Sequence, residues 1–328
     1  LTGCSERDDT GPGAFQVSDS SGIEIVYSPA PALQGEGGWS VLADPALQIG
    51  QLEGEEPFLF SIIWDAVQAP DGRIIVSEGQ NYEIRVFSGT GEFHGAFGGR
   101  GEGPEEFGGP PWIRLAPPDT LVVWDPGHYR LSWFDLKGTL LRQVSLRNVL
   151  AEQNISRFVN GRVWRFRNDG SLLSTGPGNF GMGSGLQDST LRLVFIGPAG
   201  STVHDLGQIP AGQTLGVRRS DGRSIGIGNP FATQVWAALG QNPHPLVLTG
   251  EGAWELQLKE VDGQLRRIVR ADIPQIHVTP KILDEERARF PEIVSRTGLT
   301  LGQVENAFNS LPIPDSIQAI GRIEVDAD

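Results

Sequence analysis

The sequence WDAVQAPDGRIIV at residues 64–76 decides the fold, because WIRLAPPDTLVVW at residues 112–124 repeats its pattern. The tryptophan, proline and aspartate of the two stretches coincide at an offset of 48 residues. The similarity continues after a one-residue slip, so that Tyr82 and Tyr129, two of only three tyrosines, fall at equivalent positions. A period of roughly 20–50 residues is typical of solenoids and propellers. The sequence therefore predicts a fold built from repeated units.

Each unit contains short apolar runs that are separated by turns. Residues 74–76 (IIV) and 121–123 (LVV) are continuous apolar runs, which are typical of strands buried on both faces. Residues 84–87 (IRVF) lead through a glycine-containing turn at 88–91 into a further run at 93–97. Four strands in about 47–50 residues match the size of one propeller blade. We therefore predict an all-β fold, a β-propeller of four-stranded blades.

Weaker copies extend the repeat toward the C-terminus. One includes residues 168–173 (NDGSLL), another starts near Trp236, and a fifth begins just before the end of the sequence. Strands expected within residues 14–49 would complete the last blade, since closure of the ring removes exposed sheet edges. Six blades are favoured and five are possible. The predicted organisation is a tether at residues 1–13 and a single propeller domain at residues 14–328.

Residues 97–107 (FGGRGEGPEEF), followed by an aspartate turn and two strands, resemble an NHL-type repeat. The chain is similar in particular to the six-bladed β-propeller lipoproteins of several bacterial phyla, over roughly residues 57–278. The resemblance implies a six-bladed ring. A six-bladed relative would need more sequence after Asp328, which leaves a five-bladed ring as the alternative.

The periodicity changes between residues 279 and 311, where helices are expected. Thr279 is a predicted N-cap, and Pro280 suits the first helical position that follows it. Pro291 is expected to end this helix, and a second helix is predicted to begin at Thr300. We therefore predict a helical insertion at residues 279–311 on one face of the ring, where such insertions often bind partners.

The only cysteine of the chain lies in the N-terminal sequence LTGC. This pattern resembles the lipobox of bacterial lipoproteins, in which the cysteine becomes the N-terminus and carries a diacylglycerol. The resemblance implies that Cys4 is a lipid attachment site, on the periplasmic side or at the cell surface of a bacterial membrane. The alternative is an unmodified cysteine. No run of about 18 apolar residues predicts a membrane span, so any attachment would depend on Cys4.

The composition excludes several classes of partner and site. A formal net charge of −14 argues against nucleic acid, because binding to phosphates needs clustered cations. The five histidines are dispersed without ligand spacing, and no Gly-x-Ser-x-Gly elbow occurs. We therefore predict no catalytic residue, no metal ligand and no cofactor other than the lipid on Cys4.

Several conspicuous side chains have structural interpretations. Glu78 and Asp125 occupy equivalent turn positions and are expected to act as hydrogen-bond acceptors within the fold. Trp64 and Trp112 repeat in register and are expected in the blade core. Trp39 and Trp164 do not repeat and are candidates for a surface position.

The remaining candidate site is a glycine-rich insertion at residues 176–185, which contains Phe180 and the only methionine, Met182. Loops on rigid scaffolds often carry function, so this loop is a candidate partner-binding loop. The sequence favours a lipid-anchored extracytoplasmic propeller that binds proteins at or near a membrane, as a scaffold or as an accessory subunit of a larger membrane complex. The alternative is a metal-dependent hydrolase or lyase with a site in the central channel, because the propeller fold supports both binding and catalysis.

Overall fold

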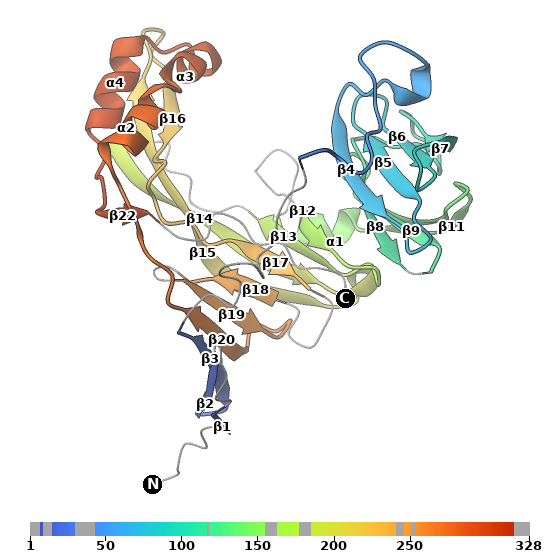
Figure 1. Ribbon diagram of the computed structural model, residues 1–328, viewed down its shortest axis with the longest axis horizontal. Helices are drawn as coiled ribbons and strands as arrows, with labels where there is room; N and C mark the ends of the chain where they lie inside the picture. The colour runs from blue at the N-terminus through green and yellow to red at the C-terminus, as the bar shows by residue number, and fades with distance from the viewer. Residues whose placement is uncertain are drawn as a thin grey trace. The chain divides into compact units, whose positions relative to one another are not determined.

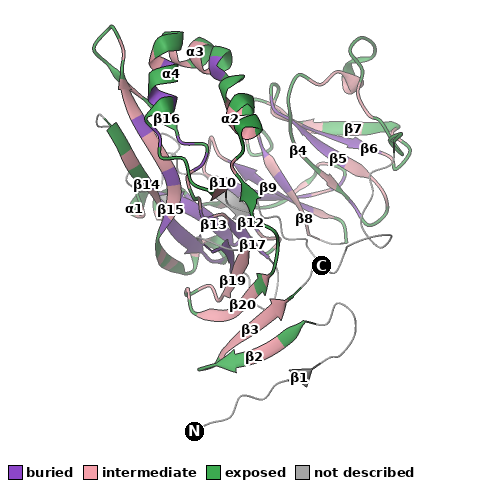
Figure 2. Ribbon diagram, turned by 60° about the vertical axis from the view of Figure 1, so that its left-hand side comes forward, coloured by how far each residue is buried: buried purple, intermediate pink, exposed green. Residues whose placement is uncertain are grey.

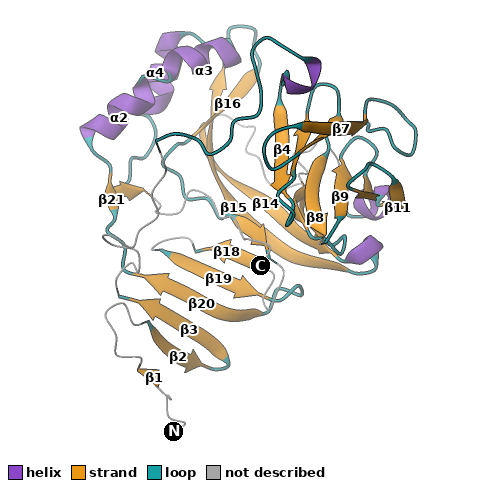
Figure 3. Cartoon of the chain, turned by 45° about the vertical axis from the view of Figure 1, so that its right-hand side comes forward, coloured by secondary structure: helices purple, strands orange, loops and turns teal. Residues whose placement is uncertain are grey.

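The computed structural model forms two compact units. It describes residues 7–8, 15–29, 43–116, 118–154, 163–176, 185–240, 246–250 and 254–317. Unit 1 consists of Leu1–Gly38, Pro177–Val194 and His204–Asp328, and unit 2 consists of Trp39–Gly176 and Phe195–Val203. Strands dominate both units (Figure 1, Figure 3), which confirms the predicted all-β class.

Unit 2 contains two four-stranded antiparallel sheets that correspond to the two clearest sequence repeats. The first sheet consists of β4 (Ile63–Gln68), β5 (Ile74–Glu78), β6 (Glu83–Phe87) and β7 (Phe93–Gly98), in that order. The second consists of β8 (Trp112–Ala116), β9 (Thr120–Asp125), β10 (Arg130–Asp135) and β11 (Leu140–Ser145). Consecutive strands are neighbours in both sheets, as in a propeller blade. The predicted four-stranded blades are confirmed here.

The core of unit 2 is formed by side chains from both blades. Ile75 and Ile84 from the first blade and Leu121 and Phe134 from the second are 0% exposed and belong to one hydrophobic cluster. The runs that contain Ile75 and Leu121 are continuously apolar because a strand that is covered on both faces has no solvent side to mark with polar residues. Each such side chain contributes roughly 1.5–3 kcal/mol relative to an exposed position.

Trp64 is not part of this core, so the prediction for it is wrong. Its exposed fraction is 40%, whereas Trp112 is partly buried. The two rings pack edge to face with their centroids 5.5 Å apart. The β4–β5 ladder shifts register between Ile63 and Asp65, so Trp64 lies at a bulge that turns it away from the cluster. Residues at equivalent positions of the repeat, such as Trp64 and Trp112, therefore occupy the same place in the blade but can differ in how far they are buried.

Tyr82 and Tyr129 explain why tyrosine recurs in the repeat. Both adopt left-handed backbone conformations, with φ of 61° and 56° respectively, which are uncommon for residues other than glycine. Arg100 lies over the Tyr82 ring at 4.2 Å, and Arg147 lies over the Tyr129 ring at 5.4 Å. Each blade thus has the same tyrosine–arginine stack beside the turn between its second and third strands.

The third repeat continues in unit 2 after a short helix, α1 (Arg147–Glu152). β12 (Val163–Phe166) pairs antiparallel with β13 (Leu172–Gly176). The Asp169 carboxylate accepts a hydrogen bond from the Ser171 N–H at 2.8 Å and so closes the turn that leads into β13. The NDGSLL sequence thus forms the turn and strand that it predicts.

Unit 1 contains a seven-stranded sheet in which strands from residues 7–28 join strands from residues 237–271. β17 (Ala237–Leu239), β18 (Leu246–Thr249), β19 (Glu255–Lys259) and β20 (Leu265–Ala271) form its antiparallel part. β3 (Ile23–Ser28) pairs in parallel with β20, and β2 (Gln16–Ser20) and β1 (Arg7–Asp8) follow it. An N-terminal strand therefore joins the sheet of the fourth repeat (Figure 1). The predicted strand around Trp39 lies outside the described residues.

Two strands of unit 1 are longer than the blade period predicts. β14 (Gly185–Ile196) has 12 residues and β15 (Val203–Arg218) has 16, whereas the blade strands of unit 2 have five or six. β15 pairs antiparallel with β16 (Ser224–Gly228) in a hairpin. This hairpin extends the sheet beyond a normal blade and provides the surface on which the helices pack.

The predicted helical insertion is present and consists of three helices. These are α2 (Pro280–Arg287), α3 (Phe290–Thr297) and α4 (Leu301–Asn309), which we call the helical cap. Two short strands, β21 (Ile276–His277) and β22 (Ser316–Ile317), pair antiparallel at its base. The pairing brings the entry and exit of the insertion together, so the cap is a self-contained element.

The ends of these helices follow from their capping residues. The Thr279 side chain accepts a hydrogen bond from the Ile282 N–H at 3.4 Å, and Thr300 forms a capping box with Gln303. Pro291 does not end a helix, contrary to the prediction, but lies in the first turn of α3. Proline is tolerated there because the first N–H groups of a helix have no intrahelical partner.

The helical cap has its own hydrophobic core against the β15–β16 hairpin. Phe290, Val304 and Phe308 from the helices pack with Leu215 of β15 and with Phe231, and all five are buried. The Phe290 and Phe308 rings lie 5.3 Å apart in an edge-to-face arrangement. The outward surfaces of α2 and α3 remain largely exposed (Figure 2).

Candidate functional site

The site residues named from the sequence lie outside the described part of the chain. Cys4, Phe180 and Met182 all fall in segments that the structure does not describe, as do Trp39 and the side chain of Trp164. The lipid attachment site and the partner-binding loop therefore stay predictions. The structure directs attention to other positions.

The buried carboxylates that recur at equivalent turn positions of the two blades form hydrogen bonds within the fold. Glu78, which is 1% exposed, accepts hydrogen bonds from the backbone N–H groups of Gln80 and Asn81 at 3.0 and 2.6 Å. Asp125, which is 0% exposed, accepts N–H groups of Gly108 and Gly127 at 3.1 and 3.0 Å. Both carboxylates thus satisfy backbone donors, as their interpretation as structural acceptors requires.

His128 joins two carboxylates in the second blade. Its Nδ1 lies 2.7 Å from Asp125 Oδ2, and its Nε2 lies 3.0 Å from Glu102 Oε2. An aspartate–histidine pair is a familiar unit of acid–base catalysis, but here the second ring nitrogen is already engaged by an exposed glutamate. The arrangement links the GRGEGPEEF loop to the turn after β9. It is a structural contact in this state of the protein.

Arg85 is a further buried charged group of this unit. Its side chain is 1% exposed, and Nη1 donates to the carbonyls of Pro57 and Leu59 at 3.0 and 2.8 Å. Nη2 lies 2.8 Å from Glu56 Oε1. These bonds hold the segment before β4 against the first blade, so Arg85 has a structural role.

The described residues were also compared with the requirements of a metal site and of a membrane-spanning helix. Among them, no group of three or more histidine, cysteine, aspartate or glutamate side chains is arranged to hold a metal ion. No helix in the described ranges combines the length and the apolar character that a membrane crossing requires. The strongest remaining candidates are two hollows in unit 1.

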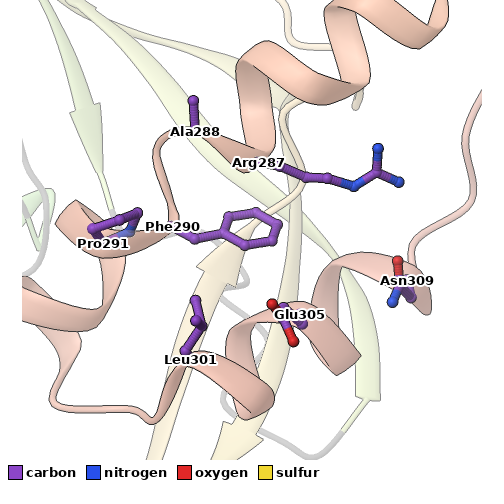
Figure 4. Close-up of a pocket in the computed structure, with 7 residues that line it drawn as sticks. All are labelled: Arg287, Ala288, Phe290, Pro291, Leu301, Glu305 and Asn309. Carbon is purple, nitrogen blue, oxygen red and sulfur yellow. The ribbon is translucent and has the colours of Figure 1, made fainter.

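The first hollow is a groove of about 470 Å³ on the helical cap, shown in Figure 4. Its lining residues are Arg287, Ala288, Phe290, Pro291, Leu301, Glu305 and Asn309. The volume falls in the range of about 300–1,000 Å³ that is typical of ligand pockets. Apolar carbon from Phe290, Pro291 and Leu301 lies beside polar groups from α4, so the groove is amphipathic.

The α4 side of the groove is a single stripe of side chains. Leu301, Glu305 and Asn309 are spaced four residues apart, so they lie on one face of the helix. Val304, Ala307 and Phe308 are buried in the core of the cap, and Leu301 lies at the border between that core face and the groove. Leu301 is 49% exposed although it is a large apolar side chain. The groove thus offers apolar surface that the cap itself does not cover.

The helical periodicity of residues 301–309 could have indicated the α4 side of this groove. Thr300 marks the start of α4, and from that start the helical period places Leu301 on one apolar stripe with Val304 and Phe308, at the edge that borders Glu305 and Asn309. The contribution of α3 was not predictable in the same way, because Pro291 suggested a helix end.

The second hollow, of about 530 Å³, lies between β14, β15 and the segment after α4. Asn229 donates to Gln213 Oε1 at 2.9 Å, and Gln213 donates to Asp188 Oδ1 at 2.9 Å. Pro312, Ile313 and Pro314 are among the other lining residues. The amide groups satisfy one another along this chain, so the hollow presents few free polar groups apart from the exposed Asp188.

Comparison with known proteins supports the fold. A family model for DUF5128, described as a 6-bladed beta-propeller, matches residues 47–147, which contain both four-stranded blades. No curated protein matches the chain. The predicted propeller is therefore confirmed at the level of the fold, whereas membership of the NHL-type lipoproteins stays a prediction.

Solved structures of low similarity were also found. A Bacteroides fragilis protein described as exported is 9% identical with a TM-score of 0.35, over 76% of this chain and 63% of that one. Virginiamycin B lyase from Staphylococcus aureus is 10% identical with a TM-score of 0.31, over 65% and 71%. A Bacteroides caccae protein of unknown function is 12% identical with a TM-score of 0.26, over 78% and 82%. The chain thus spans less than two thirds of the length of the first of these.

Proposed function

We propose that this protein is a lipid-anchored extracytoplasmic β-propeller that binds a protein partner, as a scaffold or as an accessory subunit of a membrane complex. The observation that carries the proposal is the exposed amphipathic groove on the helical cap. Large apolar side chains such as Leu301, which is 49% exposed, favour association when they line a hollow beside polar groups.

The placement of the cap supports the same function. The three helices form an insertion on an extended hairpin, closed at its base by β21 and β22. Among the described residues, none of the four- to seven-stranded sheets includes a residue of the three helices, so the insertion is an addition to the fold. Additions on one side of a repeat protein often form its binding surface.

The proposed location depends on Cys4. The sequence before residue 5 resembles a lipobox, and the polar residues that follow would act as a flexible tether. One acyl chain gives only reversible membrane binding, so a diacylglyceryl group is the modification expected of a stably held protein. A tethered propeller would present its cap to proteins in the same membrane.

The test is isolation of the full chain from its native membranes in mild detergent. We expect one protein to be recovered in stoichiometric amount, and an intact mass that corresponds to a chain starting at Cys4 with a diacylglyceryl group. Recovery without a stoichiometric partner would contradict the binding function. Stoichiometric calcium or zinc in the purified protein would instead favour a propeller hydrolase or lyase.

A further inference from the structure

The charges of the helical cap are almost completely paired within it. Nine charged side chains lie between residues 280 and 309. Eight of them form four ion pairs at helical spacing: Lys281–Glu285, Arg287–Asp284, Arg289–Glu286 and Arg296–Glu292. The ninth, Glu305, has no cationic partner among the residues that the structure describes. The cap therefore has one unmatched charge, and it is negative.

The unmatched charge lies in the groove. Glu305 lines it together with Leu301 and Asn309, and Figure 4 shows the Phe290 ring above Leu301 and Glu305, with Asn309 farther along the same helix. The Asn309 amide also makes no hydrogen bond to the described residues. One part of the groove thus offers a free carboxylate and a free amide next to apolar surface.

Arg287, the cation that shares the groove, is engaged elsewhere. Its Nη1 lies 2.9 Å from Asp284 Oδ1, and its guanidinium lies over the Phe308 ring at 5.6 Å. The first contact pairs its charge within α2, and the second places it against the ring of an α4 residue. Because all four cations of the cap already form ion pairs within it, a further cation for Glu305 would come from outside the cap.

The length of the groove limits the length of the partner segment that could supply this cation. Positions 301 and 309 are eight residues apart on a helix, or roughly 12 Å along its axis at about 1.5 Å per residue. Three or four residues of extended peptide, at about 3.3 Å each, cover the same length. Pro291 and Phe290 provide an apolar floor for one side chain of such a segment.

We infer that the groove binds a partner segment that presents a lysine or arginine to Glu305 and an adjacent apolar side chain to Leu301 and Phe290. This inference rests on the proposed binding function and names the chemistry of the partner. The net charge of −14 supports it, since a negative field attracts basic segments and repels acidic ones.

The test uses a library of random 12-residue peptides displayed on phage and selected against the full chain. We expect the selected peptides to be enriched in lysine or arginine close to a large apolar residue. Against Glu305→Lys the enrichment should reverse to aspartate and glutamate. Against Leu301→Asp the affinity of the wild-type peptides should fall at least about tenfold, because the apolar contact is lost. All of these positions are exposed, so the variants are expected to fold.

The matched control is Glu292→Lys, which changes an exposed carboxylate on α3 that does not line the groove. It should leave the selected sequences unchanged. Selection of peptides without basic enrichment, selection that ignores Glu305→Lys, or no selection at all would overturn the inference. The proposed function would survive these outcomes if the native partner is still recovered from membranes, so the two failures are distinguishable.

Discussion

Aspartate side chains at the strand turns satisfy backbone donors that the turns leave free. Asp135 follows this rule at the end of β10, where its carboxylate accepts the N–H groups of Lys137 and Thr139 at 2.9 and 2.8 Å. Hydrogen bonds to the ionised form, chiefly from Thr139, lower the pKa of the Asp135 carboxyl from its ordinary value. The pKa of the Asp71 carboxyl is also lowered, first by the hydrogen bond from the Arg73 guanidinium and then by that from the Arg73 N–H.

The lowered pKa of Asp135 predicts a pH-dependent contribution to stability. Because its folded pKa lies below its unfolded pKa, the contribution is present above the unfolded value of about 4 and is lost as the pH falls through the folded value. Asp135→Asn should therefore destabilise the protein near pH 6, and the difference from wild type should narrow toward pH 3. Urea unfolding across this range measures it. A difference that stays constant with pH would contradict the assignment.

Arg85 predicts a large loss on truncation, because two backbone carbonyls depend on it. Arg85→Met leaves the carbonyls of Pro57 and Leu59 without this donor, whereas the Glu56 carbonyl keeps the N–H of Leu59. A buried polar group without a partner costs about 1–3 kcal/mol, and we expect a total loss of about 3 kcal/mol in the free energy of unfolding. Arg73→Met is the matched control, since its pair with Asp71 is at the surface, and it should change stability by less than about 1 kcal/mol. Equal effects would refute the structural role of Arg85.

At the scale of elements, continuous apolar runs correctly predict strands, and capping residues correctly predict where helices begin. The runs at residues 74–76 and 121–123 form β5 and β9, and Thr279 and Thr300 begin α2 and α4. Proline was ambiguous, because Pro291 is compatible both with the end of one helix and with the first turn of the next. The long strands β14 and β15 were not predicted, since length depends on what packs against a hairpin and not on its own pattern.

The capping box of α4 allows the cap to be loosened without touching the groove. Thr300→Ala removes the side-chain acceptor for the Gln303 N–H and should cost about 1 kcal/mol. Amide hydrogen exchange across α4 should become roughly fivefold faster, which corresponds to that energy. Ser295→Ala, at an exposed position of α3 whose side chain makes no hydrogen bond to the described residues, should leave the exchange unchanged. Unchanged exchange in Thr300→Ala would contradict the capping role.

At the scale of the whole molecule, the repeat predicts the fold better than it predicts the site. Periodicity reports which residues are equivalent, so it found the blades and the tyrosine pair. Periodicity gives no information on residues that lie outside the repeat. The groove consists of such residues, because they belong to the helical insertion. Glu305 can be identified as the unpaired charge of the cap only after the ion pairs of the other eight charges are known. Those pairs depend on the helix boundaries.

The parallel pairing of β3 with β20 links segments about 240 residues apart in the sequence and predicts a long-range effect. Ile25 pairs with Ile268, and β3 lies between β2 and β20, so Ile25→Pro removes a donor from an interior strand. We expect a loss of about 3 kcal/mol or more and faster amide exchange in β20. Phe15→Pro, just before β2, is the control and should have little effect. Protected β20 amides in Ile25→Pro would contradict the pairing.

The central claim is that this protein acts by binding a partner through the helical cap. The most direct measurement is photo-crosslinking in native cells, with a photoreactive amino acid at position 301 in the groove or at position 295 on the exposed side of α3. The account predicts an adduct with one protein from position 301 and little or none from position 295. No adduct from position 301, or equal adducts from both positions, would contradict it.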